Sequence, residues 1–429
     1  MKTIRMTIDE INQKNIDRLL NRTDNDVSEV ESSVSEIISR VRSHGDAALY
    51  DYTEMFDGVK LDSLKVSAQE IDEGYLKVSA EFIETLKEAK NNIETYHKEQ
   101  ISNTWIKDFS QGIKLGQLVT PIDRVGLYVP GGKGGYPSTV LMDAVPAKVA
   151  GVKSIALITP PGKDGKIDPY ILAAAKIAGI DEIYRIGGAH GIAALAYGTD
   201  TIPAVNKIVG PGNIYVATAK KQVFGKVDID MIAGPSEICI IASPDSNPDF
   251  IAADLLSQAE HDEMASSMLI TWSEDLAEKV TRSVFAQMAK LSRREIMEKS
   301  IRDNGKIFIV SDLDQAISLS NMIAPEHLEV MIPDPESALN KITNAGAVFL
   351  GSYTPEPIGD YFAGPNHTLP TSGTAKFSSP LGVYDFVKRS SILYYDKKNL
   401  EKVYKKVADF AEREGFSSHA NAVRRRFDD

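Results

Sequence analysis

The sequence predicts an α/β protein with two Rossmann-like parallel-sheet domains, a helical N-terminal segment and a C-terminal tail. Short apolar runs alternate with Ala-rich helical patterns from Arg124 onward, and a second alternation of this kind starts at Glu237. Such alternation is typical of parallel sheets whose faces are covered by helices. The chain has 429 residues, of which 43% are hydrophobic, so it is long enough to bury two such cores.

The predicted elements follow in chain order. Residues 1–24 are polar and helix-prone, and apolar residues at helical spacing predict long helices over 27–41 and 80–96. After a β-rich run at 124–129, strands are expected at Ser154–Thr159, Glu182–Ile186, Lys207–Val209, Glu237–Ala242, Met268–Trp272, Lys306–Val310 and Ala347–Leu350. Between them, helices are expected to begin near Pro137, Asp168, Ala189, Asn213, Pro248 and Leu313.

We expect these elements to form four parts. Residues 1–24 are an N-terminal segment, and residues 25–127 with 238–378 form a first, discontinuous α/β domain. Residues 128–237 form a second, inserted domain, and residues 379–429 form a C-terminal helical tail. The end of this tail is too polar for a core of its own, so we expect it to dock on another surface, such as a partner subunit.

Composition excludes several classes of function. The net charge of −12 gives no reason to expect a nucleic-acid partner, because phosphate binding needs clustered Lys and Arg. The single cysteine, Cys239, excludes an intrachain disulfide framework and a multi-Cys zinc site, and its apolar surroundings indicate a buried thiol. The first residues lead into polar sequence without an apolar signal region, and no stretch is apolar enough to span a bilayer. We therefore expect a cytoplasmic protein.

Three glycine turns follow predicted strands. They are Pro130–Gly135, Gly187–His190 and Gly210–Asn213, and none matches a standard nucleotide fingerprint. Glycines after a strand let backbone N–H groups approach an anion at the next helix, and an open α/β sheet binds its ligand at this edge. Together the turns predict a nucleotide site. Taken one at a time, each is equally compatible with an unliganded loop, and Asn213 with a helix N-cap.

Gln258 and His261 are candidate metal ligands. They lie three residues apart at the end of a predicted helix, so continuing the helix would put both on one face. An amide oxygen and an imidazole can supply half of a metal site, and imidazole suits Zn²⁺. The alternative is an ordinary helix end with His261 near the C-terminal dipole.

Glu326 and His327 are candidate acid–base groups. A carboxylate beside an imidazole can keep the pKa of the imidazole near neutral pH, although a solvated Glu–His pair is an equally common arrangement. Asp360 and His367 lie in a Gly-rich loop region downstream. Ser236, in a turn entering a strand, can contact substrate or merely close the turn. In the polar tail, Glu414 and His419 have no evident structural purpose, although a histidine in such a tail is usually solvated.

Taken together, these motifs resemble the histidinol dehydrogenase family over nearly the whole chain. The motifs that carry the resemblance are Val125–Gly132, Gly210–Asn213, Ile229–Glu237, Asp254–His261, Pro325–Leu328 and Asn366–Thr371, in this order. The resemblance implies a zinc-containing homodimer that oxidises L-histidinol through the aldehyde to L-histidine with two NAD⁺. It also implies that the C-terminal tail crosses to the other subunit and completes the site there.

The resemblance also assigns roles to individual residues. It implies one Zn²⁺ per subunit, bound by Gln258, His261, Asp360 and His419, and a catalytic pair of Glu326 and His327. Implied NAD contacts are Tyr128, His190 and Asn213. Implied substrate contacts are Ser236, Gln258, His261, His327, Asp360, His367, Glu414 and His419. The family usually has Gln where this chain has His190, which can still donate a hydrogen bond to ribose or phosphate.

Two rival functions use the same residues. A zinc-dependent hydrolase would use Glu326 to activate water and would need no nucleotide. A non-catalytic nucleotide- or metabolite-binding protein would keep its ligand after loss of Glu326 and His327. Fold alone does not determine function, so these rivals need tests. Binding of NAD would distinguish a dehydrogenase from the hydrolase. Retention of the ligand after substitution of Glu326 and His327 would indicate the non-catalytic binding protein.

Overall fold

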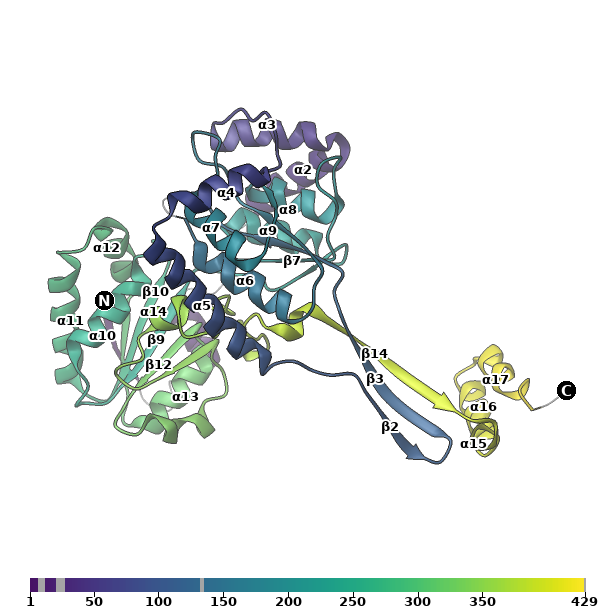
Figure 1. Ribbon diagram of the computed structural model, residues 1–429. Coiled ribbons are helices and arrows are strands. Elements are labelled where there is room, and N and C mark those ends of the chain that lie inside the picture. Colours follow the sequence, from purple (N-terminus) through teal and green to yellow (C-terminus); the bar gives the residue numbers. More distant parts are fainter. Residues whose placement is uncertain (7–11, 21–27, 132–134, 428–429) are drawn as a thin grey trace. The chain divides into compact units, whose positions relative to one another are not determined.

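The computed structural model describes residues 1–6, 12–20, 28–131 and 135–427 (Figure 1). Its contacts divide the chain into two compact units. Unit 1 comprises Met1–Gln100 and Asp123–Asp385, and unit 2 comprises Ile101–Ile122 and Phe386–Asp429. Among the described residues, no helix combines the length and apolar character needed to cross a membrane.

A six-stranded parallel sheet forms one core of unit 1. Its order is β1 (Lys2–Arg5), β11 (Lys306–Ile309), β10 (Ser266–Thr271), β9 (Glu237–Ala242), β12 (His327–Met331) and β13 (Ala347–Leu350). The strand order reverses between β9 and β12, which are paired and buried along their whole length. This reversal brings the two sequence-distant starts of β9 and β12 side by side.

Helices cover both faces of this sheet because successive residues of a buried strand point to opposite sides. Ile238 and Ile240 of β9 pack with α10 (Pro248–Ala259), α11 (Glu274–Met288) and α12 (Arg294–Asp303). Cys239 and Ile241 pack in a separate cluster with α1 (Gln13–Leu19) and α13 (Leu313–Ile323). The buried thiol predicted for Cys239 is confirmed.

A five-stranded parallel sheet forms the other core of unit 1. Its order is β6 (Glu182–Tyr184), β5 (Ser154–Ile158), β4 (Arg124–Tyr128), β7 (Lys207–Val209) and β8 (Asp228–Ile229). Its helices are α6 (Pro137–Val149), α7 (Pro169–Ala178), α8 (Gly188–Tyr197) and α9 (Ile214–Val223). The strand order reverses at β4 and β7, so the glycine turns that follow these strands share one edge.

The helices before residue 100 pack around this five-stranded sheet. They are α2 (Ser28–His44), α3 (Asp46–Asp57), α4 (Ala68–Lys77) and α5 (Ala80–Lys98). Helix α2 packs on α8 and α9, α4 on α7, and α5 on α6. We expected residues 25–127 to group with 238–378. Instead, the helices before residue 100 pack on the helices of the five-stranded sheet. An amphipathic pattern shows that a helix has an apolar face, but not which sheet it covers. The domain boundaries as such stay a prediction.

Unit 2 contains a three-stranded antiparallel sheet and three short helices. Strands β2 (Trp105–Ser110), β3 (Ile113–Pro121) and β14 (Val387–Tyr395) pair in the order β14-β3-β2. They are followed by α15 (Lys397–Glu401), α16 (Tyr404–Arg413) and α17 (Ser417–Arg424), and α16 packs on α17 around Ala408, Ala411 and Ala420. We expected a helical tail over 379–429; its helices are α15 to α17, whereas β14 in the same stretch is a strand that completes this sheet.

Three more of the described strands, β1, β8 and β12, were not predicted. β1 lies in the segment that we expected to be helical, where α1 is the helical part, and β12 begins at His327. The remaining elements of unit 1 are α14 (Glu356–Tyr361) and short 3-10 helices at Pro335–Lys341, Thr374–Lys376 and Val383–Phe386. Strand β12 and helix α14 both carry candidate site residues.

Candidate functional site

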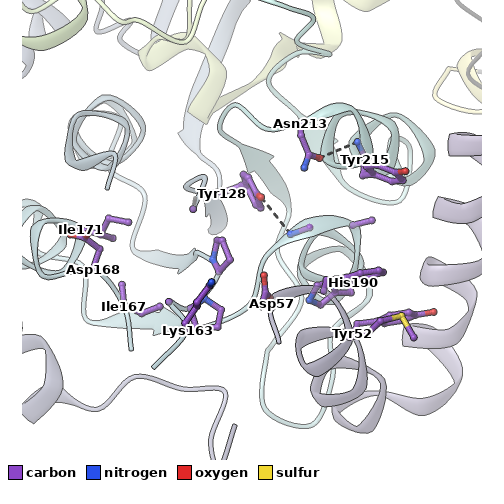
Figure 2. Close-up of a pocket in the computed structure, with 18 of the residues that line it drawn as sticks. Tyr52, Asp57, Tyr128, Lys163, Ile167, Asp168, Ile171, His190, Asn213 and Tyr215 are labelled. Carbon is purple, nitrogen blue, oxygen red and sulfur yellow. Dashed lines mark hydrogen bonds between the residues drawn. The ribbon is translucent and has the colours of Figure 1, made fainter. Parts of the chain in front are cut away.

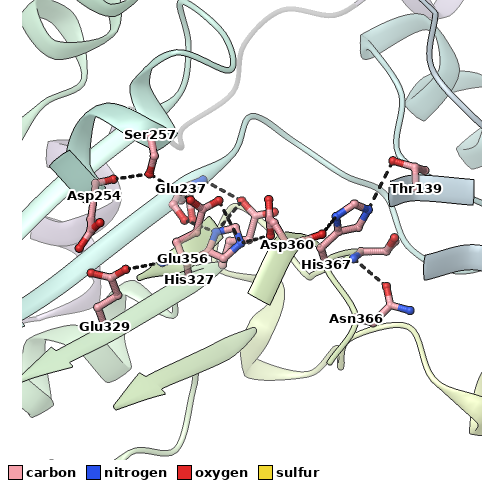
Figure 3. A network of polar contacts seen from close by, with 12 residues as sticks. Thr139, Glu237, Asp254, Ser257, His327, Glu329, Glu356, Asp360, Asn366 and His367 are labelled. Atoms are coloured by element: carbon pink, nitrogen blue, oxygen red, sulfur yellow. Dashed lines mark hydrogen bonds and ion pairs between the residues drawn. The ribbon is translucent and has the colours of Figure 1, made fainter. Parts of the chain in front are cut away.

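A buried acid–base pair, Glu326 and His327, lies where strands β9 and β12 begin. Figure 3 shows His327 beside Glu237, Glu356 and Asp360. Glu326 and His327 are 6% and 3% exposed, and His327 Nδ1 lies 3.7 Å from Glu326 Oε2. Glu326 Oε2 accepts a hydrogen bond from the Glu237 backbone N–H at 2.8 Å. His327 Nδ1 lies 3.1 Å from the Glu237 carbonyl oxygen, which can only accept. The Nδ1 therefore carries a proton, and Nε2 has no hydrogen-bond partner among the described residues.

Helix α14 brings two further carboxylates to Nε2 of His327. Glu356 and Asp360 lie one helical turn apart, so both project from one face. His327 Nε2 lies 3.5 Å from Asp360 Oδ1 and 4.0 Å from Glu356 Oε1. Glu356 is 1% exposed and Asp360 is 9% exposed. The imidazole is thus enclosed by three carboxyl groups from two elements.

This crowding of acids shifts the pKa values of the whole cluster. Burial raises the pKa values of Glu326 and Glu356 to about 8 each. Burial opposes the charged form of His327, but the carboxylates of Glu326, Asp360 and Glu356 outweigh it and raise its pKa to about 10. The positive charge of His327, whose Nε2 lies 3.5 Å from Asp360 Oδ1, holds the pKa of Asp360 below its usual value despite burial. Such an excess of buried negative charge favours a bound cation.

The donor atoms around this cluster fit a metal ion. One ligand atom each of His261, Glu356 and Asp360 lies within 4.8 Å of the others. Gln258 at the end of α10 is fully buried, and neither its amide oxygen nor its amide nitrogen has a hydrogen-bond partner among the described residues. A buried amide without a partner is costly unless a ligand satisfies it. Nitrogen and oxygen donors of this kind suit Zn²⁺.

We expected Gln258 and His261 to lie on one continuous helix, but they do not. Helix α10 ends at Ala259, Glu260 caps it, and His261 follows in a turn. The His261 backbone N–H still donates to the Gln258 carbonyl at 3.2 Å. The turn therefore keeps the two residues adjacent while leaving the His261 side chain exposed toward the acidic cluster.

Behind Glu356, a set of polar groups determines its position. Ser257 Oγ donates to Glu356 Oε2 at 3.0 Å, and the Glu356 backbone N–H donates to Glu329 Oε1 at 2.8 Å. Glu329 is itself buried in β12, and burial together with the neighbouring Asp254 raises its pKa well above the usual value. These contacts leave Glu356 Oε1 without a hydrogen-bond partner among the described residues. Our sequence predictions missed Glu356, Glu329 and Asp254.

His367 and Ser236 border the cluster. His367 Nδ1 lies 3.1 Å from the Asp360 carbonyl, and His367 Nε2 lies 3.4 Å from Thr139 Oγ1 of α6. His367 and Asp360 line a cavity of about 390 Å³. Ser236 is half-buried and precedes β9, where its carbonyl accepts a hydrogen bond from Ser266 N–H at 2.9 Å. The predicted residues Ser236, Gln258, His261, Glu326, His327, Asp360 and His367 all belong to unit 1.

A second, larger cavity lies at the glycine-turn edge of the five-stranded sheet (Figure 2). It has a volume of about 1340 Å³, and Tyr128, His190 and Asn213 line it. Their contacts with NAD stay a prediction. Tyr128 accepts a hydrogen bond from Gly188 N–H at 3.4 Å, and the Asn213 side chain caps α9. Gly131 and Gly135 also line the cavity, whereas Gly132–Gly134 of the predicted phosphate loop lie outside the described residues.

His190 has an unusual environment within this cavity. It is 1% exposed, and neither ring nitrogen has a hydrogen-bond partner among the described residues. Burial lowers its pKa to about 4, so the ring is neutral. Its ring lies 5.7 Å from that of Tyr52 and 5.9 Å from that of Phe56. A neutral imidazole with both nitrogens unpaired can offer one donor and one acceptor to a ligand.

A buried ion pair holds the glycine turn after β7. Lys220 of α9 pairs with Asp230, and Lys220 Nζ donates to the Gly210 carbonyl at 2.8 Å. Asp230 Oδ2 accepts from Gly210 N–H at 2.8 Å. Gly210 has a φ of +118°, and a Cβ there would lie 2.1 Å from the Tyr128 carbonyl oxygen. Only glycine fits this position. The N–H and the carbonyl of Gly210 are both hydrogen-bonded, so the conformation of the turn is fixed by both groups.

Glu414 and His419 belong to unit 2, which is described by itself. Glu414 caps α16 and His419 lies on α17, and both side chains are exposed. The ring of His419 lies 5.3 Å from that of Phe416. Their predicted roles in binding metal and substrate stay predictions.

Comparison with known proteins gives one consistent result. A family model described as histidinol dehydrogenase matches residues 20–427. A protein of Clostridium acetobutylicum named histidinol dehydrogenase is 54% identical over 415 residues, covering 97% of this chain and 96% of the relative. One of the same name from Listeria monocytogenes is 52% identical over the full length of both chains. The crystal structure of histidinol dehydrogenase from Elizabethkingia anophelis superposes with a TM-score of 0.93 at 37% identity, covering 99% of this chain and 98% of that one.

Proposed function

The chain belongs to the histidinol dehydrogenase family, and on this basis we propose that its buried Glu326–His327 pair catalyses the four-electron oxidation of L-histidinol to L-histidine with two NAD⁺. The enzyme is an NAD-dependent oxidoreductase of histidine biosynthesis. The observation that carries the catalytic assignment is a buried imidazole whose Nδ1 proton is fixed by the Glu237 carbonyl and whose Nε2 has no hydrogen-bond partner among the described residues. The zinc hydrolase alternative gains no support from the comparisons.

His327 is suited to take the proton of the substrate alcohol. Its Nε2 lies beside Asp360 and Glu356, and its Nδ1 proton is engaged by the Glu237 carbonyl. A cation bound by these carboxylates would offset the negative charge that raises the pKa of His327, and Nε2 could then accept a proton. General acid–base catalysis needs such a positioned acceptor while the carbon-bound hydrogen leaves as hydride. When bound in the large cavity, NAD⁺ supplies the hydride acceptor.

Glu326 is suited to the second oxidation. The aldehyde must add water before it loses a second hydride, and a carboxylate beside His327 can accept the proton that water releases. The hydrogen bond from Glu237 N–H fixes the orientation of Glu326. Over the whole reaction one water is added, two hydrides leave the substrate carbon for two NAD⁺, and three protons are released as the carboxylate of L-histidine forms.

We propose that one Zn²⁺ per subunit is bound by Gln258, His261, Asp360 and His419. The unpaired amide of Gln258 and the acidic surroundings of His261 support the first three assignments. When bound, zinc supplies a fixed charge that orients the imidazole and amine of the substrate. We propose that substrate contacts are made by Ser236, Gln258, His261, His327, Asp360, His367, Glu414 and His419.

We further propose a cytoplasmic homodimer in which the C-terminal tail completes the partner's site. Large apolar side chains of unit 2 are exposed on its sheet and helices, including Phe109 at 62%, Leu393 at 71% and Phe410 at 67%. A three-stranded sheet with so little cover needs another surface for stability. A second copy of the chain would supply that surface. Glu414 and His419 could then bind substrate and metal in the site of that second copy.

Single-turnover oxidation tests the role of His327. His327→Asn should slow the first hydride transfer by a factor of about 10² to 10⁴, because a positioned base contributes this much. His44→Asn is a matched control, because His44 is exposed on α2 and should leave the rate unchanged. Unimpaired hydride transfer in the His327 variant would contradict the proposed base.

A further inference from the structure

Asp57 occupies an unfavourable position in the wall of the large cavity. It is the last residue of α3, and its carboxylate lines the cavity with Tyr128 and His190 (Figure 2). Its Oδ2 atom is buried and has no hydrogen-bond partner among the described residues. Burial raises the pKa of Asp57 to about 6. A negative charge at the C-terminal end of a helix also opposes the helix dipole, so nothing local explains this carboxylate.

Cations line the same cavity without pairing with Asp57. Arg40 forms its ion pair with Asp51, and within the described parts of the chain no ion pair joins Asp57 to Lys77, Lys163 or Lys166. These lysines suit the phosphates of an anionic ligand, whereas Asp57 repels phosphate. Glu36, Asp164 and Asp168 also line the cavity, so its charge is mixed. A ligand there meets cations that suit phosphate and carboxylates that suit hydroxyl donors.

Aromatic side chains flank Asp57. The preceding residue, Phe56, lines the cavity, is 56% exposed and stacks on Tyr52 with ring centroids 5.5 Å apart. On the other side, the charge of Asp57 adds to the effect of burial in raising the pKa of Tyr128 to about 12. An acceptor between aromatic surfaces, near cations, matches a ligand that combines a flat ring, hydroxyl groups and phosphate, as a nucleotide does.

We propose that Asp57 accepts hydrogen bonds from the vicinal hydroxyls of a ribose of the bound dinucleotide. This inference rests on the proposed use of the cavity for NAD. An ionised carboxylate is a strong acceptor for two neighbouring hydroxyls, and Asp57 lines the cavity in which the dinucleotide would lie. Asp57 reaches this position from a helix that precedes the sheet rather than from a strand of the sheet itself.

Equilibrium binding of NADH to the zinc-loaded enzyme, measured by its fluorescence, tests this role. Asp57→Asn should weaken NADH binding roughly tenfold, because a charged acceptor becomes a neutral one of equal size. Asp57→Ala should weaken it at least as much. Glu54→Gln is the matched control, because Glu54 is an exposed residue of the same helix outside the cavity, and the same charge is removed.

The direction of the effect is decisive. If Asp57 acted only through its long-range charge, its removal would strengthen the binding of the anionic NADH. Unchanged or tighter binding by Asp57→Asn therefore overturns the proposal. A wild-type enzyme that binds no NADH would instead contradict the cofactor assignment of the cavity. Thermal unfolding of both variants should show no loss of stability, because the substitution relieves an unfavourable charge at a helix end.

Competition by ADP identifies the ribose. ADP carries only the adenosine ribose, so a loss of ADP affinity equal to that of NADH in Asp57→Asn assigns the adenosine side. A loss for NADH with unchanged ADP affinity assigns the nicotinamide side. Both results support hydrogen bonding to ribose. Equal affinity of wild type and variant for both ligands contradicts it.

Discussion

At the level of single residues, we expect Gln258 to be needed for metal binding but not for folding. Its amide is fully buried and unpaired among the described residues, so it contributes nothing evident to the metal-free fold. Gln258→Leu should therefore leave the melting temperature of the metal-free protein unchanged or raised, because a buried unsatisfied group is removed. Zinc content measured by mass spectrometry should fall well below one ion per chain.

An exposed glutamine provides the control for this variant. Gln69→Leu, on α4, should retain full zinc content. Full zinc content in Gln258→Leu would remove Gln258 from the ligand set. A marked loss of metal-free stability would show that its amide has a structural partner.

Asp143 makes the stability of the fold depend on pH. It is fully buried on α6, Thr368 Oγ1 donates to its Oδ1 at 3.2 Å, and burial together with Asp230 raises its pKa well above the usual 3.8. A carboxyl group with a higher pKa in the folded chain makes folding take up a proton. Its contribution to stability is thus present at low pH and is lost as the pH rises from 3.8 through the raised pKa.

Asp143→Asn should remove this dependence. The free energy of unfolding of the variant, measured with denaturant, should exceed that of wild type increasingly as the pH rises above about 5. Asp245→Asn, at an exposed site, should follow the wild-type curve. Parallel curves for wild type and Asp143→Asn would contradict the assigned shift.

At the scale of elements, the buried Lys220–Asp230 pair joins α9 to the glycine turn after β7. Lys220→Met would leave the Asp230 charge buried without its cation and remove the donor to the Gly210 carbonyl. Loss of one partner of a buried pair costs about 3–5 kcal/mol, which denaturant unfolding measures. Adding Asp230→Asn should recover part of the loss, because the stranded charge disappears. No recovery would mean that packing of the lysine stem dominates.

The elements of the parallel sheets were predictable because each buried strand is a continuous apolar run. Strand β12 was missed because its sequence, His327–Met331, contains a buried glutamate. Glu329 is present in the strand to accept the backbone N–H of Glu356 on α14. A functional network thus interrupts the pattern from which the strand would have been recognised.

The sequence indicated most of the candidate site residues, but it could not show how they are arranged in space. Spacing in the sequence cannot show that Asp360 and His327, from different elements, approach to 3.5 Å. We expected Asp360 in a loop-rich region that begins at Gly359, whereas Asp360 and Glu356 both lie on α14. Glu356 was missed because no helix was predicted there. The strands of unit 2 were missed because they are largely exposed and lack a clear apolar alternation.

At the scale of the whole molecule, mixing two inactive variants tests the proposed exchange of tails. His327→Asn and His419→Asn should each be inactive as homodimers. If the tail crosses, a mixed dimer contains one site with both histidines intact, so refolding an equal mixture should restore about a quarter of wild-type activity. If each tail serves its own subunit, both sites of the mixed dimer remain defective and no activity returns.

The most direct test of the central claim is the amount of NADH formed per mole of L-histidinol, with L-histidinol limiting and NAD⁺ and zinc in excess. Our assignment predicts two, because Glu326 and His327 together support both oxidations. One NADH would mean that the reaction stops at the aldehyde and would contradict the role given to Glu326. No NADH at all would contradict the proposed oxidation itself.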